Sequence, residues 1–232
     1  GKTSVVSALV RAMNALQQKT MLMAPTGRAA KVIAGYSGFP AFTIHKKIYR
    51  QKSMAEFRFQ LSDNLFQHTL FIVDEASMIS NTGGDTEFGS GRLLDDLIEF
   101  VYSGEGCSLL LLGDTAQLPP VMQPHSPALE KDKLAGYGLK VHEFTLTHVV
   151  RQALESGILH NATHLREMLI EDKTAIFPHF DTEGFTDIRY LNGMDLIDEI
   201  QRAYNGVGVE DTIVVTRSNK RANMYNNGIR NR

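Results

Sequence analysis

Two adjacent acids, Asp74 and Glu75, directly follow the apolar run 70–73. Mg²⁺ prefers hard oxygen ligands, and phosphoryl transfer needs a positioned nucleophile. We therefore expect Asp74 to hold Mg²⁺ through its water shell and Glu75 to orient and deprotonate an attacking water. Taken alone, the two acids also fit the ordinary solvated end of a strand, so they need support from elsewhere in the chain.

That support comes from Gly1, Lys2 and Thr3, which match the last three positions of the phosphate-binding loop GxxxxGK[ST]. Backbone N–H groups at the start of the following helix would hold phosphate oxygens. Lys2 would neutralise the β- and γ-phosphates, and the Thr3 hydroxyl would coordinate Mg²⁺. The tripeptide is a weak signal alone, but with Asp74 and Glu75 it predicts an NTPase. The loop glycines would precede Gly1, so we expect the natural chain to begin upstream and this chain to bind ATP weakly.

Gln117 stands in the string GDTAQLPPV over 113–121, just past the apolar run 109–112. An amide at this place can bond the γ-phosphate or its attacking water and so report hydrolysis. Pro119 and Pro120 fix the loop that follows, because each proline locks its own φ near about −65°.

The segments that carry these residues alternate between short apolar runs and longer amphipathic stretches. The spacing predicts helices over 3–17, 28–34 and 93–102, and strands over 21–24, 70–73 and 109–112. This alternation predicts an α/β fold with a mostly parallel sheet that is covered on both faces. Such sheets bind ligands at the carboxyl ends of their strands, where Thr26, Asp74 and Asp114 stand.

The chain divides into three parts by its pattern. Residues 1–150 form a first domain with a small hairpin insert near 46–66, residues 151–205 a helical continuation and connection, and residues 206–232 the incomplete start of a second domain. We expect helices over 156–169 and 219–230 and a buried strand over 213–215. The stretch 81–91, rich in Gly, Asp and Thr, predicts a mobile loop.

Composition excludes several classes of protein. The net charge of −2 excludes a uniformly basic protein, so nucleic acid would bind through a local positive track. Cys107 is the single cysteine, which rules out an intrachain disulfide and favours a reducing, cytoplasmic compartment. The histidines lack HExxH spacing, and no apolar run approaches the roughly 20 residues that span a bilayer, so we expect no membrane partner.

The motifs together resemble a known family. GKT, APTGRAAK over 24–31, TIH over 43–45, VDEASM over 73–78, GDTAQLPPV and RQ at 151–152 are similar to motifs I, Ia, Ib, II, III and IV of superfamily 1 DNA helicases, in that order. The RecD/Dda-like branch is the most similar. The resemblance implies a P-loop NTPase (RecA-like) domain, followed by the start of a second RecA-like domain near 212–230.

The resemblance also implies roles. Lys2 and Thr3 would bind nucleotide phosphate and Mg²⁺, and Gln117 would couple the nucleotide state to movement. Arg151 would reach the γ-phosphate, although by itself it also fits a surface arginine. The catalytic residues would thus be Glu75, Gln117 and Arg151. ATP and Mg²⁺ are the implied ligands, and single-stranded DNA the implied partner.

The family places DNA against motifs Ia and Ib. The corresponding residues here are Pro25, Thr26, Gly27, Arg28, Thr43 and His45. Backbone N–H groups and Arg28 can hold a DNA phosphate at this strand-to-helix turn. His45 fits a structural histidine equally well.

A local basic stretch is interleaved with aromatic residues. Its members are Lys46, Lys47, Arg50, Lys52 and Arg58, with Tyr49, Phe57 and Phe59 among them. Such a mixture suits a single-strand track, but Phe57, Phe59 and Leu61 alternate with polar residues, which favours core packing over base stacking. With Asp63 and Asn64 as a turn, this stretch could form a small hairpin insert, and the resemblance implies that such an insert helps to split the duplex.

The sequence therefore predicts an ATP-dependent DNA helicase or translocase core that moves on single-stranded DNA, 5′ to 3′ by resemblance, in DNA repair or recombination. One alternative is a DNA-dependent ATPase subunit of an exonuclease or recombination complex that does not itself unwind. Another is a non-catalytic nucleic-acid-binding module. Motifs V and VI would follow later in the family, so we expect this chain alone to be weakly active or inactive.

Overall fold

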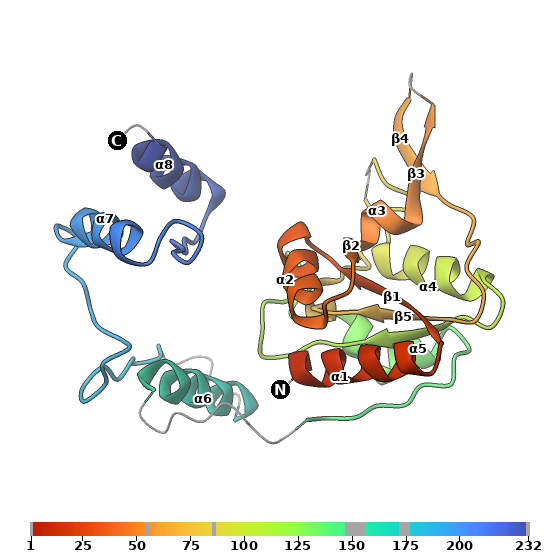
Figure 1. The fold of residues 1–232 in the computed structure, drawn as a ribbon, viewed down its shortest axis with the longest axis horizontal. Coiled ribbons are helices and arrows are strands. Elements are labelled where there is room, and N and C mark those ends of the chain that lie inside the picture. Colours follow the sequence, from red (N-terminus) through yellow and green to blue (C-terminus); the bar gives the residue numbers. More distant parts are fainter. Residues whose placement is uncertain (1, 54–55, 85–86, 147–155, 172–176, 231–232) are drawn as a thin grey trace. The chain divides into compact units, whose positions relative to one another are not determined.

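The computed structural model describes residues 2–53, 56–84, 87–146, 156–171 and 177–230, with the side chains of Thr3 and of residues 52–57 excepted. Contacts divide the chain into two compact units, Gly1–Gln152 and Ala153–Arg232 (Figure 1). Each unit is described by itself.

The first unit is built on a four-stranded parallel sheet. Its strands are β1 (Lys19–Ala24), β2 (Ala41–Thr43), β5 (Thr69–Val73) and β6 (Ser108–Leu111), in the spatial order β2-β1-β5-β6. The three strands expected from the apolar runs are confirmed, and β2 adds an edge strand that the sequence did not predict. The α/β class with a parallel sheet is confirmed.

Helices cover both faces of this sheet (Figure 1). They are α1 (Lys2–Ala15), α2 (Gly27–Ser37), α3 (Ile44–Ile48), α4 (Leu93–Ser103) and α5 (Lys131–Ala135), with short 3₁₀ turns η1 (Ala76–Met78) and η2 (Pro127–Leu129). Strand side chains alternate between the faces. Leu22 and Ile72 pack with Val6, Val10 and Ile33 of α1 and α2.

The neighbouring strand residues face the other way and form the larger core. Met23, Phe71 and Val73 pack there with residues of α3 and α4, and Phe71 meets Phe100 edge to face at 5.9 Å between ring centroids. Both cores are built from strand residues with period two, so the sheet is buried on both sides.

A separate antiparallel hairpin leaves the first unit beyond α3. Strand β3 (Tyr49–Ser53) pairs with β4 (Glu56–Leu61), with Tyr49 opposite Leu61 and Ser53 opposite Glu56. Figure 1 shows the hairpin extending away from the parallel sheet. Its base, at Tyr49 and Leu61, joins the larger core.

The second unit is helical in its described residues. It contains α6 (Gly157–Ile170), α7 (Leu196–Gly206) and α8 (Asn219–Arg230). The carboxylate of Asp187 caps α6, accepting from the Ser156 hydroxyl at 2.6 Å and from the Gly157 N–H at 2.8 Å. The helices expected over 156–169 and 219–230 are confirmed.

The strand expected over 213–215 is wrong. No strand is assigned to this segment, and Ile213 and Val215 are 59% and 85% exposed. A strand exists only by pairing its backbone with a neighbour. Within 156–171 and 177–230 the structure assigns no strand that could serve as this neighbour.

Candidate nucleotide site and DNA-facing residues

The candidate residues stand at one edge of the parallel sheet. Register pairs Ala24 of β1 with Thr43 of β2, and Met23 with Val73 of β5. Because the strands are parallel, the residues that follow β1, β2, β5 and β6 emerge together at their carboxyl ends. This edge holds Pro25–Arg28, Thr43, Asp74 and Glu75, and the segment from Gly113 to Gln117.

Glu75 adopts an unusual backbone conformation. Its φ of 55° and ψ of 37° are left-handed, which few residues with a side chain adopt. The Asp74 carboxylate accepts a hydrogen bond from the Glu75 N–H at 2.9 Å, and the Ala76 N–H donates to the Leu112 carbonyl at 2.8 Å. The turn that carries Glu75 is therefore held by Asp74 on one side and by Leu112, just past β6, on the other.

The electrostatics of Glu75 suit a base. Burial raises the pKa of its carboxyl above the ordinary value, and the charges of Asp74 and Asp114 add to this rise, while Lys2 opposes it. A carboxylate whose pKa is raised toward neutrality accepts a proton more readily. The sequence placed Asp114 at the ligand-binding edge of the sheet without assigning it a role, and the structure adds its charge to the surroundings of Glu75.

Lys2 and Gln117 meet across the site. The Lys2 Nζ lies 3.5 Å from the Gln117 Oε1, although 115 positions separate them in the chain. The Asp114 carboxylate accepts from the Ala116 N–H at 3.0 Å, and the Gln117 N–H donates to the Asp114 carbonyl at 3.0 Å. This compact turn sets the direction in which the Gln117 side chain leaves β6.

A buried serine, Ser126, links the short 3₁₀ turn η1, after Glu75, to η2, after the Gln117 loop. Ser126 is 4% exposed and its hydroxyl lies 2.8 Å from the Ala76 carbonyl oxygen and 2.7 Å from that of Ile79. The same oxygen accepts from the Ala128 N–H at 3.3 Å. Ser126 thus links η2, which follows the Gln117 loop, to η1, which follows Glu75.

The residues brought together fit a nucleotide with Mg²⁺ by their chemistry. One ammonium (Lys2), three carboxylates (Asp74, Glu75 and Asp114) and one amide (Gln117) act on the same small region. In the described part of the chain, three or more His, Cys, Asp or Glu side chains do not gather as a metal cluster. Mg²⁺ takes oxygen ligands, commonly one or two carboxylates together with substrate phosphates.

Three of the predicted residues cannot be placed. Gly1 and Arg151 lie outside the described residues, as does the side chain of Thr3. Their roles stay predictions.

The motif Ia turn has the form of a helix start. The Thr26 hydroxyl accepts from the Ala29 N–H at 3.2 Å and caps α2, with Pro25 before it and the exposed Gly27 and Arg28 after it. A capped helix start presents N–H groups and a positive dipole end, to which an anionic phosphate is attracted.

The motif Ib residues differ from each other. Thr43 caps α3 by accepting from the Lys46 N–H at 3.2 Å. The His45 ring instead packs against Tyr49 and Phe88, with centroids 5.6 and 5.1 Å away, and burial lowers its pKa. These contacts fit the structural alternative for His45.

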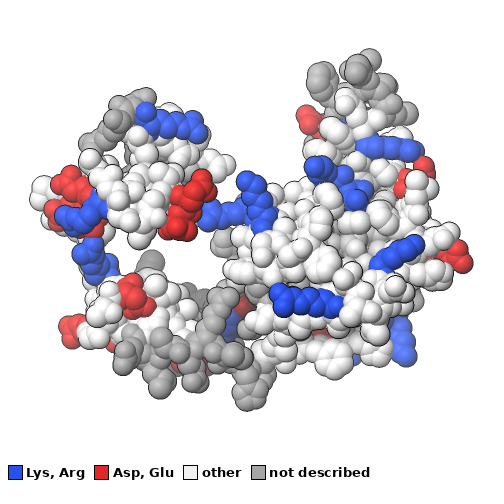
Figure 2. All heavy atoms as spheres, in the orientation of Figure 1, with Lys and Arg blue, Asp and Glu red and all other residues white. Residues whose placement is uncertain are grey.

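Basic side chains flank the hairpin. The Lys47 Nζ lies 4.4 Å from the centre of the Phe42 ring and 5.1 Å from that of Phe66, so these rings orient it. Figure 2 shows Lys and Arg spread over the visible face of the first unit, including its hairpin. Phe59 stacks on Phe88 at 4.6 Å, in agreement with core packing, whereas the side chain of Phe57 lies outside the described part.

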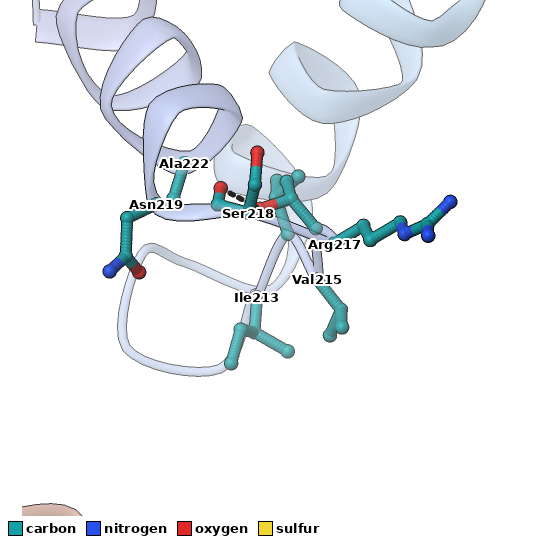
Figure 3. Close-up of a pocket in the computed structure, with 8 residues that line it drawn as sticks. Ile213, Val215, Arg217, Ser218, Asn219 and Ala222 are labelled. Atoms are coloured by element: carbon teal, nitrogen blue, oxygen red, sulfur yellow. Dashed lines mark hydrogen bonds between the residues drawn. The ribbon is translucent and has the colours of Figure 1, made fainter. Parts of the chain in front are cut away.

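A hollow of about 520 Å³ lies elsewhere, in the second unit. Its walls come from one stretch, Ile213–Asn219 with Ala222, and Figure 3 shows Arg217 extending away from Ile213. None of the residues expected to bind nucleotide lines it. We therefore place the candidate site by its charged groups and not by this hollow. Among the described helices, none is both long and apolar enough to cross a membrane.

Comparison with known families decides the identity of this arrangement. The family described as "AAA domain" matches residues 1–184, which include every motif through Arg151. The chain belongs to the AAA domain family. The match extends from the first unit into α6 and agrees with the P-loop NTPase fold of the parallel sheet. The resemblance to RecD-like superfamily 1 helicases agrees with this family and with the similarity to a RecD2 helicase.

Two individual proteins are similar to parts of this chain. The chain is 31% identical over 163 residues to the ATP-dependent RecD2 DNA helicase of Deinococcus radiodurans, covering 70% of this chain and 20% of that protein. A crystal structure of Bacteroides sp. Pif1 in complex with ADP-AlF4 is 19% identical, with a TM-score of 0.29, over 56% of this chain and 29% of that one. The chain therefore spans less than a third of either relative.

Proposed function

We propose that this AAA domain is the ATP-hydrolysing part of a DNA helicase that moves on single-stranded DNA. The observation that carries the proposal is the convergence of Lys2, Glu75, Asp114 and Gln117 at one sheet edge. The similarity to RecD2, which is named an ATP-dependent DNA helicase, supports the choice of DNA as the track.

In the proposed reaction, Glu75 accepts a proton from the attacking water, whose oxygen forms a bond to the γ-phosphorus. The bond from that phosphorus to the β–γ bridging oxygen breaks, which releases ADP and inorganic phosphate. Lys2 neutralises charge on the phosphates, and the Gln117 amide contacts the γ-phosphate or the water. Bound Mg²⁺, held through Asp74 and Thr3, would supply further charge neutralisation. Arg151 would stabilise the charge on the equatorial oxygens of the γ-phosphoryl group in the transition state.

The DNA side of the proposal rests on the turns at the same edge. The Thr26-capped start of α2 with Arg28, and the start of α3 at Thr43, would hold backbone phosphates. The β3–β4 hairpin would meet the duplex at a fork. Movement from 5′ to 3′ and a role in repair or recombination are proposed on the resemblance to the RecD/Dda-like branch.

Glu75→Gln in the longest natural chain that contains these residues tests the function. It keeps the size of the side chain but removes the base, so ATP hydrolysis should fall at least about a hundredfold while ATP still binds. Glu99→Gln, the same change on the exposed face of α4, is the matched control and should leave hydrolysis unchanged.

Hydrolysis that survives Glu75→Gln would reject the assignment and favour a non-catalytic nucleic-acid-binding module. Hydrolysis that responds to DNA, without strand separation on forks tailed at either end, would instead favour the ATPase subunit. Unwinding only of 3′-tailed forks would overturn the proposed polarity.

A further inference from the structure

The hairpin is attached to one helix, α4, on both sides of its base, by Tyr49 at the start of β3 and by Asn64 in the segment that follows β4. On the incoming side, the Tyr49 hydroxyl donates to the Asp96 carboxylate at 2.6 Å. On the outgoing side, the Asn64 amide donates to the carbonyls of Phe100 at 2.8 Å and Val101 at 3.1 Å. The two attachments engage opposite ends of α4, so the helix spans the base of the hairpin.

Asp96 is the buried end of this arrangement. It is 3% exposed, and its Oδ2 accepts from the Ser90 N–H at 3.0 Å as well as from Tyr49. Gly89 lies directly over it with φ of 48°, and a Cβ on Gly89 would come within 2.1 Å of the Asp96 Oδ2 and 2.5 Å of the Tyr49 ring. Only glycine leaves room for the loop to close over the carboxylate.

The loop that closes over Asp96 also pairs with the hairpin. The Phe59 N–H donates to the Glu87 carbonyl at 2.7 Å, and the Gly89 N–H donates to the Phe59 carbonyl at 2.8 Å. The Phe88 ring stacks on that of Phe59 at an interplanar angle of 16°. Residues 87–90, part of the stretch whose composition predicts a mobile loop, therefore run alongside β4 and hold it.

The same cluster reaches the motif Ib helix. His45 of α3 contacts both Tyr49 and Phe88, and Tyr49 contacts Phe88 at 5.6 Å between ring centroids. Burial raises the pKa of the Tyr49 hydroxyl, with the hydrogen bond to Asp96 adding to the rise, so the hydroxyl keeps its proton as a donor. Motif Ib and the hairpin thus share one packed base.

We propose that Asp96, with Tyr49, Asn64 and Phe88, forms a brace that positions the hairpin for its contact with forked DNA. A two-stranded hairpin is marginally stable by itself in water. A hairpin that meets a duplex must also resist the force of the strands it divides. The brace fixes its direction relative to α3, so that a phosphate held at Thr43 and a fork met by the hairpin have a constant spacing. This inference rests on the proposed DNA-dependent function.

Tyr49→Phe tests the brace in the 232-residue chain, because it removes the hydroxyl and keeps the ring. Hydrogen exchange is measured by mass spectrometry for peptides of β3 and β4 and, as an internal reference, for peptides of β1 and β5. Loss of the buried bond should speed exchange in the hairpin about tenfold and leave the reference strands unchanged. Tyr137→Phe is the matched control, since it removes another tyrosine bond to α4, at Asp95, away from the hairpin.

Hairpin exchange that stays at the wild-type rate in Tyr49→Phe, or rises equally in Tyr137→Phe, would overturn the brace. If Tyr49→Phe unfolds the whole unit, Phe88→Leu replaces it. That variant keeps the hydrogen bonds of Asp96 and removes the ring stacked on Phe59, and it should speed exchange in β4 alone. Unchanged exchange in β4 would then overturn the brace.

Binding of labelled DNA separates this inference from the function on which it rests. Tyr49→Phe should weaken binding to a fork and leave binding to single-stranded oligothymidine at the wild-type level. Equal weakening of both would contradict a role in positioning. A wild-type chain that binds neither DNA would reject the proposed DNA function, while the exchange comparison would still decide whether the brace exists.

Discussion

Replacing Ser126 with alanine is the sharpest test of how the two turns beside the nucleotide site are held together. Ser126 is 4% exposed, and its hydroxyl approaches the carbonyls of Ala76 and Ile79, both on fully buried residues. Ser126→Ala removes the single hydroxyl proton that these carbonyls share, and the Ala76 carbonyl then keeps only its bond from the Ile79 N–H at 3.1 Å. Such a loss costs about 1–3 kcal/mol, and the short distances place the expected value near about 2 kcal/mol.

Ser37→Ala is a matched control in the same unit. Ser37 is 2% exposed, and its hydroxyl approaches the carbonyls of Ala34 at 3.5 Å and Phe39 at 3.4 Å and accepts from the Phe39 N–H at 3.1 Å. The longer bonds predict a smaller loss of about 1 kcal/mol. Ser37 ends α2 and touches neither turn of the nucleotide site.

Calorimetry of the 232-residue chain measures the difference. At roughly 2–4 °C per kcal/mol, Ser126→Ala should lower the melting temperature by about 4–8 °C and Ser37→Ala by about half as much. Because Ser126 holds the turn after Glu75, only its variant should also slow ATP hydrolysis with ATP affinity retained, measured in the longest natural chain that contains these residues. A Ser126→Ala melting temperature within about 1 °C of the wild type would refute this reasoning, as would equal effects of both variants on hydrolysis.

Two further outcomes can be measured. Burial raises the pKa of Asp95, but hydrogen bonds from Tyr137 and Asn81 outweigh burial, so its pKa lies below the ordinary 3.8. Its contribution to stability is therefore complete above that value and lost as pH falls through the lower folded pKa. In urea denaturation, the free energy of unfolding of the wild type should exceed that of Tyr137→Phe above pH 3.8, and this difference should shrink at lower pH. A difference that does not change with pH would contradict the stabilising role of the Tyr137–Asp95 bond. Deleting Gln51–Asp63 should impair unwinding more than ATP hydrolysis in the longest natural chain; equal losses would contradict a role for the hairpin at the fork.

The sequence predicted the elements that position the nucleotide site because their signals are local. Buried runs end in Asp74 and in the GDTAQ string, and parallel strands bring such ends to one edge whatever the details of packing. The prediction of a strand at 213–215 was wrong because strand formation is not a local property. An apolar run becomes a strand only if another strand pairs with it. Its composition contains no information about that partner.

The brace and the link between the turns could not be predicted in this way. Asp96 stands within an amphipathic helix, where an acid normally reads as a solvated residue, and only the fold brings Tyr49 and Ser90 to it. Ser126 lies 50 positions from Ala76. Such contacts between distant segments depend on loop paths that no periodicity records.

The left-handed backbone at Glu75 sets stability against chemistry at a single position. A residue with a side chain is strained there by roughly 1–2 kcal/mol, and glycine would relieve that strain. Glycine would also remove the carboxylate on which hydrolysis depends. A library of variants selected only for folding should therefore become enriched in glycine at position 75, whereas a library selected for ATP turnover should retain glutamate. The difference in stability between the two selected sets would measure the folding free energy that the protein gives up to keep its catalytic carboxylate.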